Sequence, residues 1–245
     1  MFLTFHFGVY DILLIAAVVC MGTSAAYIKN PQWKSFILLL PFPSSLSALA
    51  IGKPVDSSFI IGLFLVPLFF YIIRKLYDGM GINIIVSIII SALVYCLIGF
   101  AVFRILHDSM TLFTSSFILV NIFALFLHIH KPRTQEEGYK STLPVYVKVP
   151  IIAIVIIVLL NFKNTLGGFM ALFPMAGVVS AYEVRHCMNA VFRQIPVMIS
   201  AVSCMFGTCY FLQDITGLYW GIIASWCVYM ILLLLTKKAW MSGAE

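Results

Sequence analysis

Charged residues are scarce in this chain, and their scarcity restricts the chemistry it can perform. Only 10% of its 245 residues are Asp, Glu, Lys or Arg, and only nine of these are acids. General acid–base catalysis needs positioned titratable groups, so nine acids supply few candidates. The sequence also lacks a His-Glu-x-x-His metal motif, a Gly-x-Ser-x-Gly nucleophile elbow and a glycine-rich phosphate loop. We therefore expect no enzyme, no catalytic residue, no metal site and no cofactor.

The cysteines and the basic residues do not indicate a metal, disulfide or nucleic-acid site. The six cysteines have no metal-ligand spacing, and five of them fall within long apolar stretches, where a small apolar side chain is at home. The net charge is +6, but the cations are dispersed in short segments rather than gathered into a stripe with interleaved aromatics. We therefore expect neither a disulfide framework nor a nucleic-acid partner.

Long apolar runs dominate what remains. Hydrophobic residues make up 62% of the chain, and the mean hydropathy is +1.08. A helix needs about 20 apolar residues to cross the roughly 30 Å of membrane hydrocarbon. The pattern predicts an all-α, polytopic integral membrane protein with about nine transmembrane helices. They are expected at 7–27, 35–51, 57–73, 82–103, 110–129, 147–162, 165–182, 191–212 and 216–236.

The positions of the fifteen Lys and Arg residues predict the orientation in the bilayer. Twelve follow the odd-numbered apolar stretches, namely Lys29, Lys34, Arg74, Lys75, Lys131, Arg133, Lys140, Lys148, Arg185, Arg193, Lys237 and Lys238. The opposite side receives only Lys53, Arg104 and Lys163. Cytoplasmic loops carry the excess of Lys and Arg. The N-terminus is therefore expected outside and the C-terminus in the cytoplasm.

The chain divides into two similar halves. We predict a four-helix repeat at 1–106, a linking helix and cytoplasmic loop at 107–146, and a second four-helix repeat at 147–245. In the first half Pro43 precedes Pro67 by 24 positions, and in the second Pro174 precedes Pro196 by 22. Because five helices separate the starts of the two copies, the copies are expected to be inverted in the membrane. Inverted repeats with proline-interrupted helices at corresponding positions are typical of secondary transporters.

The interrupted helices at 35–51 and 165–182 supply most of the candidate site. Pro41 and Pro43 remove two backbone donors, and unpaired backbone groups are tolerated in a membrane only where protein or water covers them. The nearby serine hydroxyls either hydrogen-bond to these unpaired backbone groups or bind a polar ligand, and the sequence leaves both interpretations open. The candidate substrate-binding residues are Pro43, Ser44, Ser45, Ser47, Asn121, Pro174 and Ser180.

Three charged residues are candidates for ion coupling or gating. Asp11 lies about one turn inside the first apolar stretch, where it either binds a coupling ion or is an interfacial acid that reaches water or caps a neighbouring helix. Glu183 and Arg185 follow the Phe-Pro helix and form either a gate or a solvated helix end. Asn121, in the middle of its helix, either lines the path or holds helices together.

One stretch of the second half resembles a known family. The run Gly167-Gly168-Phe169-Met170-Ala171-Leu172-Phe173-Pro174 continues through Ser180-Ala181-Tyr182 to Ile195-Pro196 and a Trp-containing terminal helix. Over 147–236 the chain resembles the GlpM-type membrane proteins, a small bacterial family of about four helices linked to alginate production. The resemblance implies a fused, duplicated version of that unit in the bacterial inner membrane.

Two functions remain open from the sequence. The first is a transporter or flippase of a polar or lipid-linked small molecule that works through the two interrupted helices. The second is a non-catalytic membrane subunit that holds together an envelope polysaccharide or lipid assembly complex. The expected partners are the lipid bilayer and that small molecule, with a second copy or an envelope-complex subunit as further possibilities.

Overall fold

The computed structural model describes residues 8–30, 33–34, 36–37, 40–106, 108–130, 144–160, 168–185 and 188–236. The side chains of residues 176, 180 and 184 lie outside the description, as do residues 131–143 of the predicted segment 107–146. Within the described ranges the regular elements are all helical. The predicted all-α class is therefore confirmed.

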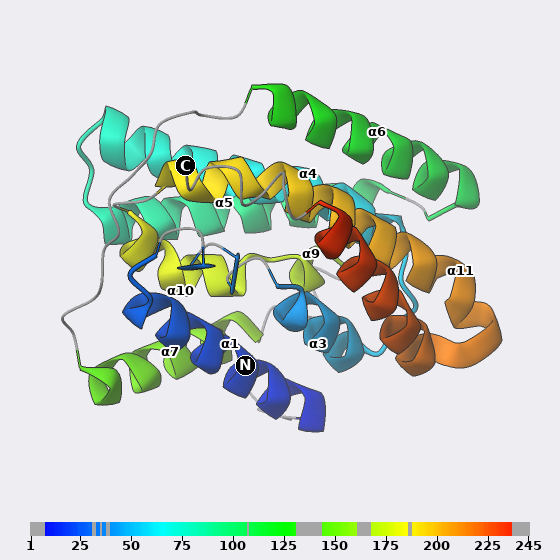
Figure 1. Cartoon of the computed structure of the whole chain (residues 1–245), viewed down its shortest axis with the longest axis horizontal. Coiled ribbons are helices and arrows are strands. Elements are labelled where there is room, and N and C mark those ends of the chain that lie inside the picture. The colour runs from blue at the N-terminus through cyan, green and yellow to red at the C-terminus, as the bar shows by residue number, and fades with distance from the viewer. Residues whose placement is uncertain are drawn as a thin grey trace.

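The helices pack as an elongated bundle (Figure 1). Their bounds are α1 Val9–Tyr27, α3 Phe42–Ile51, α4 Ser57–Arg74 with the π-helix η1 Lys75–Gly79, α5 Ile84–Ile105, α6 Met110–Ile129, α7 Val145–Leu160, α9 Gly168–Ala171, α10 Met175–Val184 and α11 Met188–Leu235. We name the two ends of the bundle by one residue each. The Lys148 end is where α5 and α7 begin, and the Asp108 end is where α4 and α6 begin.

Five of the described helical segments are long and apolar enough to cross a membrane, as expected for a membrane-embedded protein. They are Val9–Tyr27, Ser57–Gly79, Ile84–Ile105, Met110–Ile129 and Met188–Leu235. The apolar helices α3 and α7 are shorter, at 10 and 16 residues. Helix α3 begins directly after Pro41 and α7 directly after Pro144, and the description of α7 ends at Leu160.

Helix α11 is a hairpin of two arms, 188–216 and 218–235. Gly217 breaks the helix with φ 79° and ψ 162°, a left-handed conformation that glycine adopts without steric cost. A Cβ placed on Gly221 would lie 3.5 Å from the Cα of Gln213, so residues eight apart are in contact. In a continuous helix they would be about 12 Å apart at 1.5 Å per residue. The chain therefore reverses at the Asp108 end (Figure 1).

Polar contacts tie the Asp108 end together. Gln213 of α11 accepts from the Val55 amide at 2.7 Å and donates to the Val55 carbonyl at 2.9 Å. Asp108 accepts from the Ser57 amide at 2.9 Å and from its hydroxyl at 2.6 Å, and Asp56 caps α4 through the Ser58 amide. The segment before α4 is thus bound both to the α11 hairpin and to the start of α6.

Burial raises the pKa of Asp56, and the neighbouring Asp108 carboxylate raises it further, against hydrogen bonds from Ser58 that lower it. Because the folded pKa lies above the ordinary value of 3.8, the folded state binds this proton more tightly than the unfolded state. Stability from this group is therefore gained as the pH falls through the folded pKa. We expect Asp56→Asn, which keeps a capping oxygen, to reduce that gain in thermal unfolding measured across acidic pH.

Asp78→Asn is the matched control, since Asp78 is half exposed and only weakly paired with Arg74, at 3.9 Å. It should reproduce the pH dependence of the parent protein. Identical pH curves for the parent and Asp56→Asn would contradict the prediction.

Candidate functional site

In the first interrupted segment, serines of the same segment hydrogen-bond to the backbone. Helix α3 begins at Phe42 with Pro41 at the N-cap, and Pro43 occupies its second position. The Pro41 carbonyl accepts from the Ser45 amide and from the Ser44 hydroxyl, both at 2.9 Å. The prolines therefore define where α3 starts. The Ser44 hydroxyl hydrogen-bonds to the backbone, in agreement with the first of the two interpretations of these serines.

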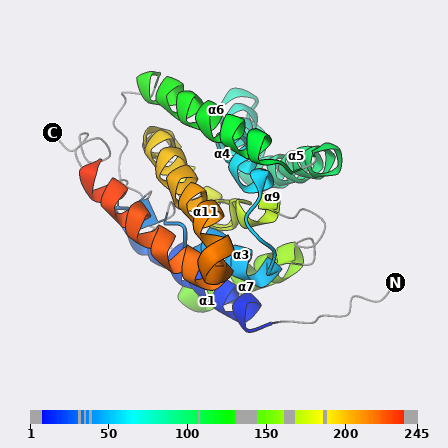
Figure 2. The ribbon, with the colours of Figure 1, turned by 90° about the vertical axis from the view of Figure 1, so that its right-hand side faces the viewer.

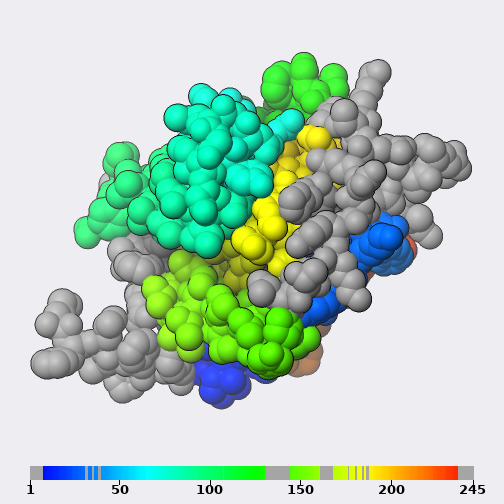
Figure 3. Space-filling model, turned by 90° about the vertical axis from the view of Figure 1, so that its left-hand side faces the viewer, coloured from blue at the N-terminus to red at the C-terminus, as the bar shows by residue number. Residues whose placement is uncertain are grey.

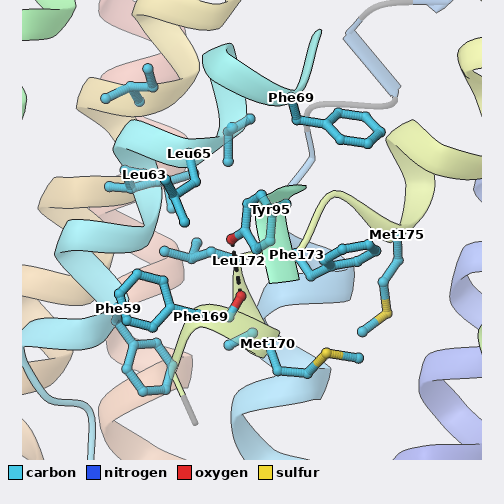
Figure 4. Close-up of a cluster of buried hydrophobic side chains, with 14 of the residues drawn as sticks. Phe59, Leu63, Leu65, Phe69, Tyr95, Phe169, Met170, Leu172, Phe173 and Met175 are labelled. Atoms are coloured by element: carbon cyan, nitrogen blue, oxygen red, sulfur yellow. Dashed lines mark hydrogen bonds between the residues drawn. The ribbon is translucent and has the colours of Figure 1, made fainter. Parts of the chain in front are cut away.

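The second interrupted segment lies between α9 and α10. Helix α9 ends at Ala171, and α10 begins after Pro174 at its N-cap. Two carbonyls near the break are satisfied from other helices. The Phe169 carbonyl accepts from the Tyr95 hydroxyl of α5 at 3.0 Å (Figure 4), and the Met170 carbonyl accepts from the Ser47 hydroxyl of α3 at 3.5 Å.

Helix α9 lies in the centre of the bundle, and each of its four residues is buried. Figure 2 shows it between α5 on one side and α3 and α7 on the other. The Phe169 ring packs where Gly62 of α4 and Gly99 of α5 leave room for it, since a Cβ on Gly99 would come within 3.3 Å of that ring. Phe173 meets the Tyr95 ring edge-on, with ring centroids 5.0 Å apart (Figure 4). Small residues on two helices thus hold the broken segment at the core.

The two interruptions line one cavity. It has a volume of about 70 Å³, large enough for two or so water molecules at roughly 30 Å³ each. Pro43 and Ser44 from α3 and Pro174 from the second break are among its walls, so three predicted site residues meet there. The described residues that line it are Leu40, Pro41, Pro43, Ser44, Val66, Phe70, Ala171, Leu172, Phe173, Pro174, Met175, Gly177, Val191, Met198 and Val202.

Other predicted site residues lie apart from this cavity. Ser45 accepts from the indole N–H of Trp226 at 2.9 Å, and Ser47 points to the Met170 carbonyl as described above. Asn121 lines a separate pocket of about 410 Å³ between α6 and α11, where it accepts from the Ser203 hydroxyl at 3.2 Å. The Ser180 side chain lies outside the described residues. Asn121 therefore joins two helices and is not part of the central cavity.

Asp11 lies buried in the first turn of α1, with 2% of its surface exposed. Its carboxylate accepts from the Gly8 amide at 2.9 Å, which completes the start of its own helix. It is not among the residues that line the central cavity. Its burial and its bond to its own helix start therefore correct the interpretation that it reaches water or caps a neighbouring helix, and ion coupling stays a prediction.

A buried ion pair is the strongest electrostatic feature of the Lys148 end. Lys148 Nζ of α7 lies 2.5 Å from Glu183 Oε1 of α10, and the two residues are 6% and 5% exposed. The ammonium group also lies 5.2 Å from the centre of the Tyr27 ring of α1, within cation–π range. The second carboxylate oxygen, Glu183 Oε2, is buried without a hydrogen-bond partner among the described residues.

This pair corrects the assignment of Lys148 to a loop and that of Glu183 to a solvated helix end. Lys148 belongs to the first turn of α7 and is buried with Ile152, Ile156 and Leu160, which follow it at four-residue intervals on one helix face. That spacing is the sequence feature that identifies Lys148 as inward-facing. Arg185, in contrast, stacks on the Tyr182 ring at 3.9 Å and donates to the Tyr182 carbonyl.

Replacing Tyr95 by phenylalanine tests how the second break is held. Tyr95→Phe removes the hydroxyl that satisfies the buried Phe169 carbonyl, and an unsatisfied buried acceptor costs about 1–3 kcal/mol. We expect the melting temperature in detergent or nanodiscs to fall accordingly. Tyr71→Phe, at a position 55% exposed, is the control and should change little. Equal melting temperatures for the two variants would show that the hydroxyl does not support α9.

Comparison of the chain with models of known protein families, with curated proteins and with solved structures finds no match.

Proposed function

We propose that this chain is a membrane transporter or flippase of a polar or lipid-linked small molecule, with its path at the two interrupted helices. The shared cavity is the observation that carries the proposal. Pro43 and Pro174 are 131 positions apart, yet both line it. Irregular backbone inside a membrane is tolerated where it lines a cavity, and discontinuous helices form the binding sites of many transporters.

The nine-helix arrangement in two inverted repeats belongs to the same proposal. The α11 hairpin is consistent with its two arms being the last two of nine predicted helices. Helix α6, the predicted link, packs against both α4 of the first half and α11 of the second. Helices α1 and α7, the first of each half, lie side by side and run in opposite directions (Figure 1). These features support the proposal of two inverted copies of one unit.

By the positive-inside argument, the Lys148 end faces the cytoplasm of a bacterial cell and the Asp108 end faces outward. Alternating access would then expose the central cavity first at one end and then at the other. Such movement is typically a rocking of one repeat against the other around a fixed central site.

Access to Ser44 from each membrane side tests the proposal. Ser44→Cys, in a chain whose native cysteines are replaced by serine, places one thiol at the cavity wall. We expect a membrane-impermeant thiol reagent to modify it both in right-side-out and in inside-out vesicles. Ser225→Cys, at a fully buried position on α11 outside the cavity, should stay unmodified in both. Modification of Ser44→Cys from one side only, or from neither, would contradict transport and favour a non-transporting scaffold.

A further inference from the structure

An apolar groove runs between α5 and α7, with α10 at its base. Its volume is about 580 Å³, and each described residue that lines it is aliphatic except one cysteine. Ala92 and Cys96 contribute from α5, Ile152 and Val155 from α7, and Val178 and Val179 from α10. Figure 3 views the Lys148 end, where the yellow α10 region is visible beside the teal of α5 and the lime green of α7.

Helix α10 separates this groove from the central cavity. Gly177 lines the cavity, whereas the next two residues, Val178 and Val179, line the groove. The same helix begins at the Pro174 break. A movement of α10 about its proline end would therefore change the wall between the lateral groove and the central cavity.

The ion pair closes one end of the groove. Lys148 precedes the groove residue Ile152 by four positions on α7, and Glu183 follows the groove residue Val179 by four positions on α10. Residues four apart share a helix face. The pair therefore joins the two helices one turn beyond the apolar lining, at the Lys148 end. There an ammonium group, and a buried carboxylate oxygen that has no hydrogen-bond partner in the part of the chain that the structure describes, lie next to the aliphatic groove.

We infer that the groove binds an acyl chain of a membrane lipid whose headgroup carries a phosphate and a hydroxyl. This inference rests on the proposed function and assigns its substrate to the lipid-linked class. The chain lies along α5 and α7, and the headgroup lies at the ion pair. The Lys148 ammonium donates to the phosphate, and Glu183 Oε2 accepts from the hydroxyl. A lipid is the occupant because the groove is aliphatic, lies along the membrane-length helix α5 and has charged groups only beyond one end.

Photo-crosslinking in nanodiscs tests the position of the acyl chain. The probe is phosphatidylglycerol with a diazirine in one acyl chain, and the adducts are mapped by mass spectrometry after digestion. We expect adducts concentrated on α5 and α7 at the groove. Ala92→Phe fills the groove and should reduce them about tenfold, which corresponds to about 1.4 kcal/mol. Ala101→Phe, at an exposed position of the same helix outside the lining, should leave them unchanged.

Adducts spread evenly over the exposed helix faces, and insensitive to Ala92→Phe, would mean that only surrounding bulk lipid is detected, which overturns the inference. The headgroup is tested by exchanging the probe for phosphatidylcholine, which carries a phosphate but no hydroxyl. We expect several-fold fewer groove adducts with that probe. The double variant Lys148→Met/Glu183→Met should abolish the difference between the two lipids, and a preserved difference would contradict the headgroup position.

The two proposals fail in distinguishable ways. If Ser44→Cys reacts from both sides while the groove forms no specific adducts, transport stands and the lipid assignment is wrong. If the groove forms specific adducts while Ser44→Cys reacts from one side only, the lipid site stands and transport is wrong.

Discussion

Lys148→Met is expected to lower the free energy of unfolding by about 3–5 kcal/mol, because it leaves the Glu183 carboxylate buried without its counter-charge. The loss is large relative to the total stability of a folded domain, which is commonly 5–15 kcal/mol. Thermal unfolding in nanodiscs, followed by circular dichroism, would measure it. Lower yield of folded protein in the membrane is a second expected result.

The double variant distinguishes the effect of losing both charges of the ion pair from the effect of losing the cation alone. When both charges are replaced by apolar residues of similar size, as in Lys148→Met/Glu183→Met, neither is left unpaired, and such replacements are often neutral or stabilising. We therefore expect the double variant to be more stable than Lys148→Met. Lys75→Met removes an exposed cation from η1 and should change stability by less than about 0.5 kcal/mol. Equal losses in the single and double variants would show that the two charges are not energetically coupled.

Gly168→Ala is expected to give the second large effect, a loss of about 1–3 kcal/mol from overpacking. An added Cβ would lie 2.8 Å from Cε2 of the buried Phe59 ring and still closer to the Ser58 hydroxyl. Phe59 packs in turn on Phe206, with ring centroids 5.1 Å apart, so the ring has little room to move. Gly168→Leu should prevent α9 from packing into the core of the bundle, and size-exclusion chromatography in detergent would detect the resulting aggregation.

Gly79→Ala is the control for this glycine. A Cβ there meets no heavy atom within 4 Å, so the substitution should alter the melting temperature little or raise it slightly. If Gly168→Ala and Gly79→Ala melt at the same temperature, α9 is not packed against α4 as closely as the structure places it.

The helices could be predicted well where apolar runs end at strong local boundaries. The predicted 110–129 coincides with α6, whose start is capped by the Ser109 hydroxyl. Helix α5 is two residues later than predicted because Asn83 caps it. The prolines also indicated where the helices at 35–51 and 165–182 are interrupted, because proline removes a backbone donor wherever it falls. Neighbouring residues in the sequence determine these features, and for that reason they can be predicted from the sequence.

The contacts between helices could not be predicted in the same way. Nearly every face of these helices is apolar, so hydropathy does not say which face meets which neighbour. Asn121 and Ser44 looked alike as polar residues within apolar helices, yet they line different pockets. Lys148 was counted with the loop cations because a charge near a helix start ordinarily reaches water. Its partner Glu183 is 35 positions away, and only the packing of α7 against α10 brings them together.

The two hydrogen bonds between Gln213 and Val55 have a mechanical consequence. They connect the second half of the chain to the first at the Asp108 end, and Val55 itself is buried. At the Lys148 end, the ion pair connects α7 and α10, both of which belong to the second half. The halves also meet at the Lys148 end, where the Lys148 ammonium lies over the Tyr27 ring of α1 and Arg74 of α4 lies over the Phe192 ring of α11. Directional hydrogen bonds therefore fix the register of the two halves at the Asp108 end, whereas these less directional cation–π contacts hold them together at the Lys148 end.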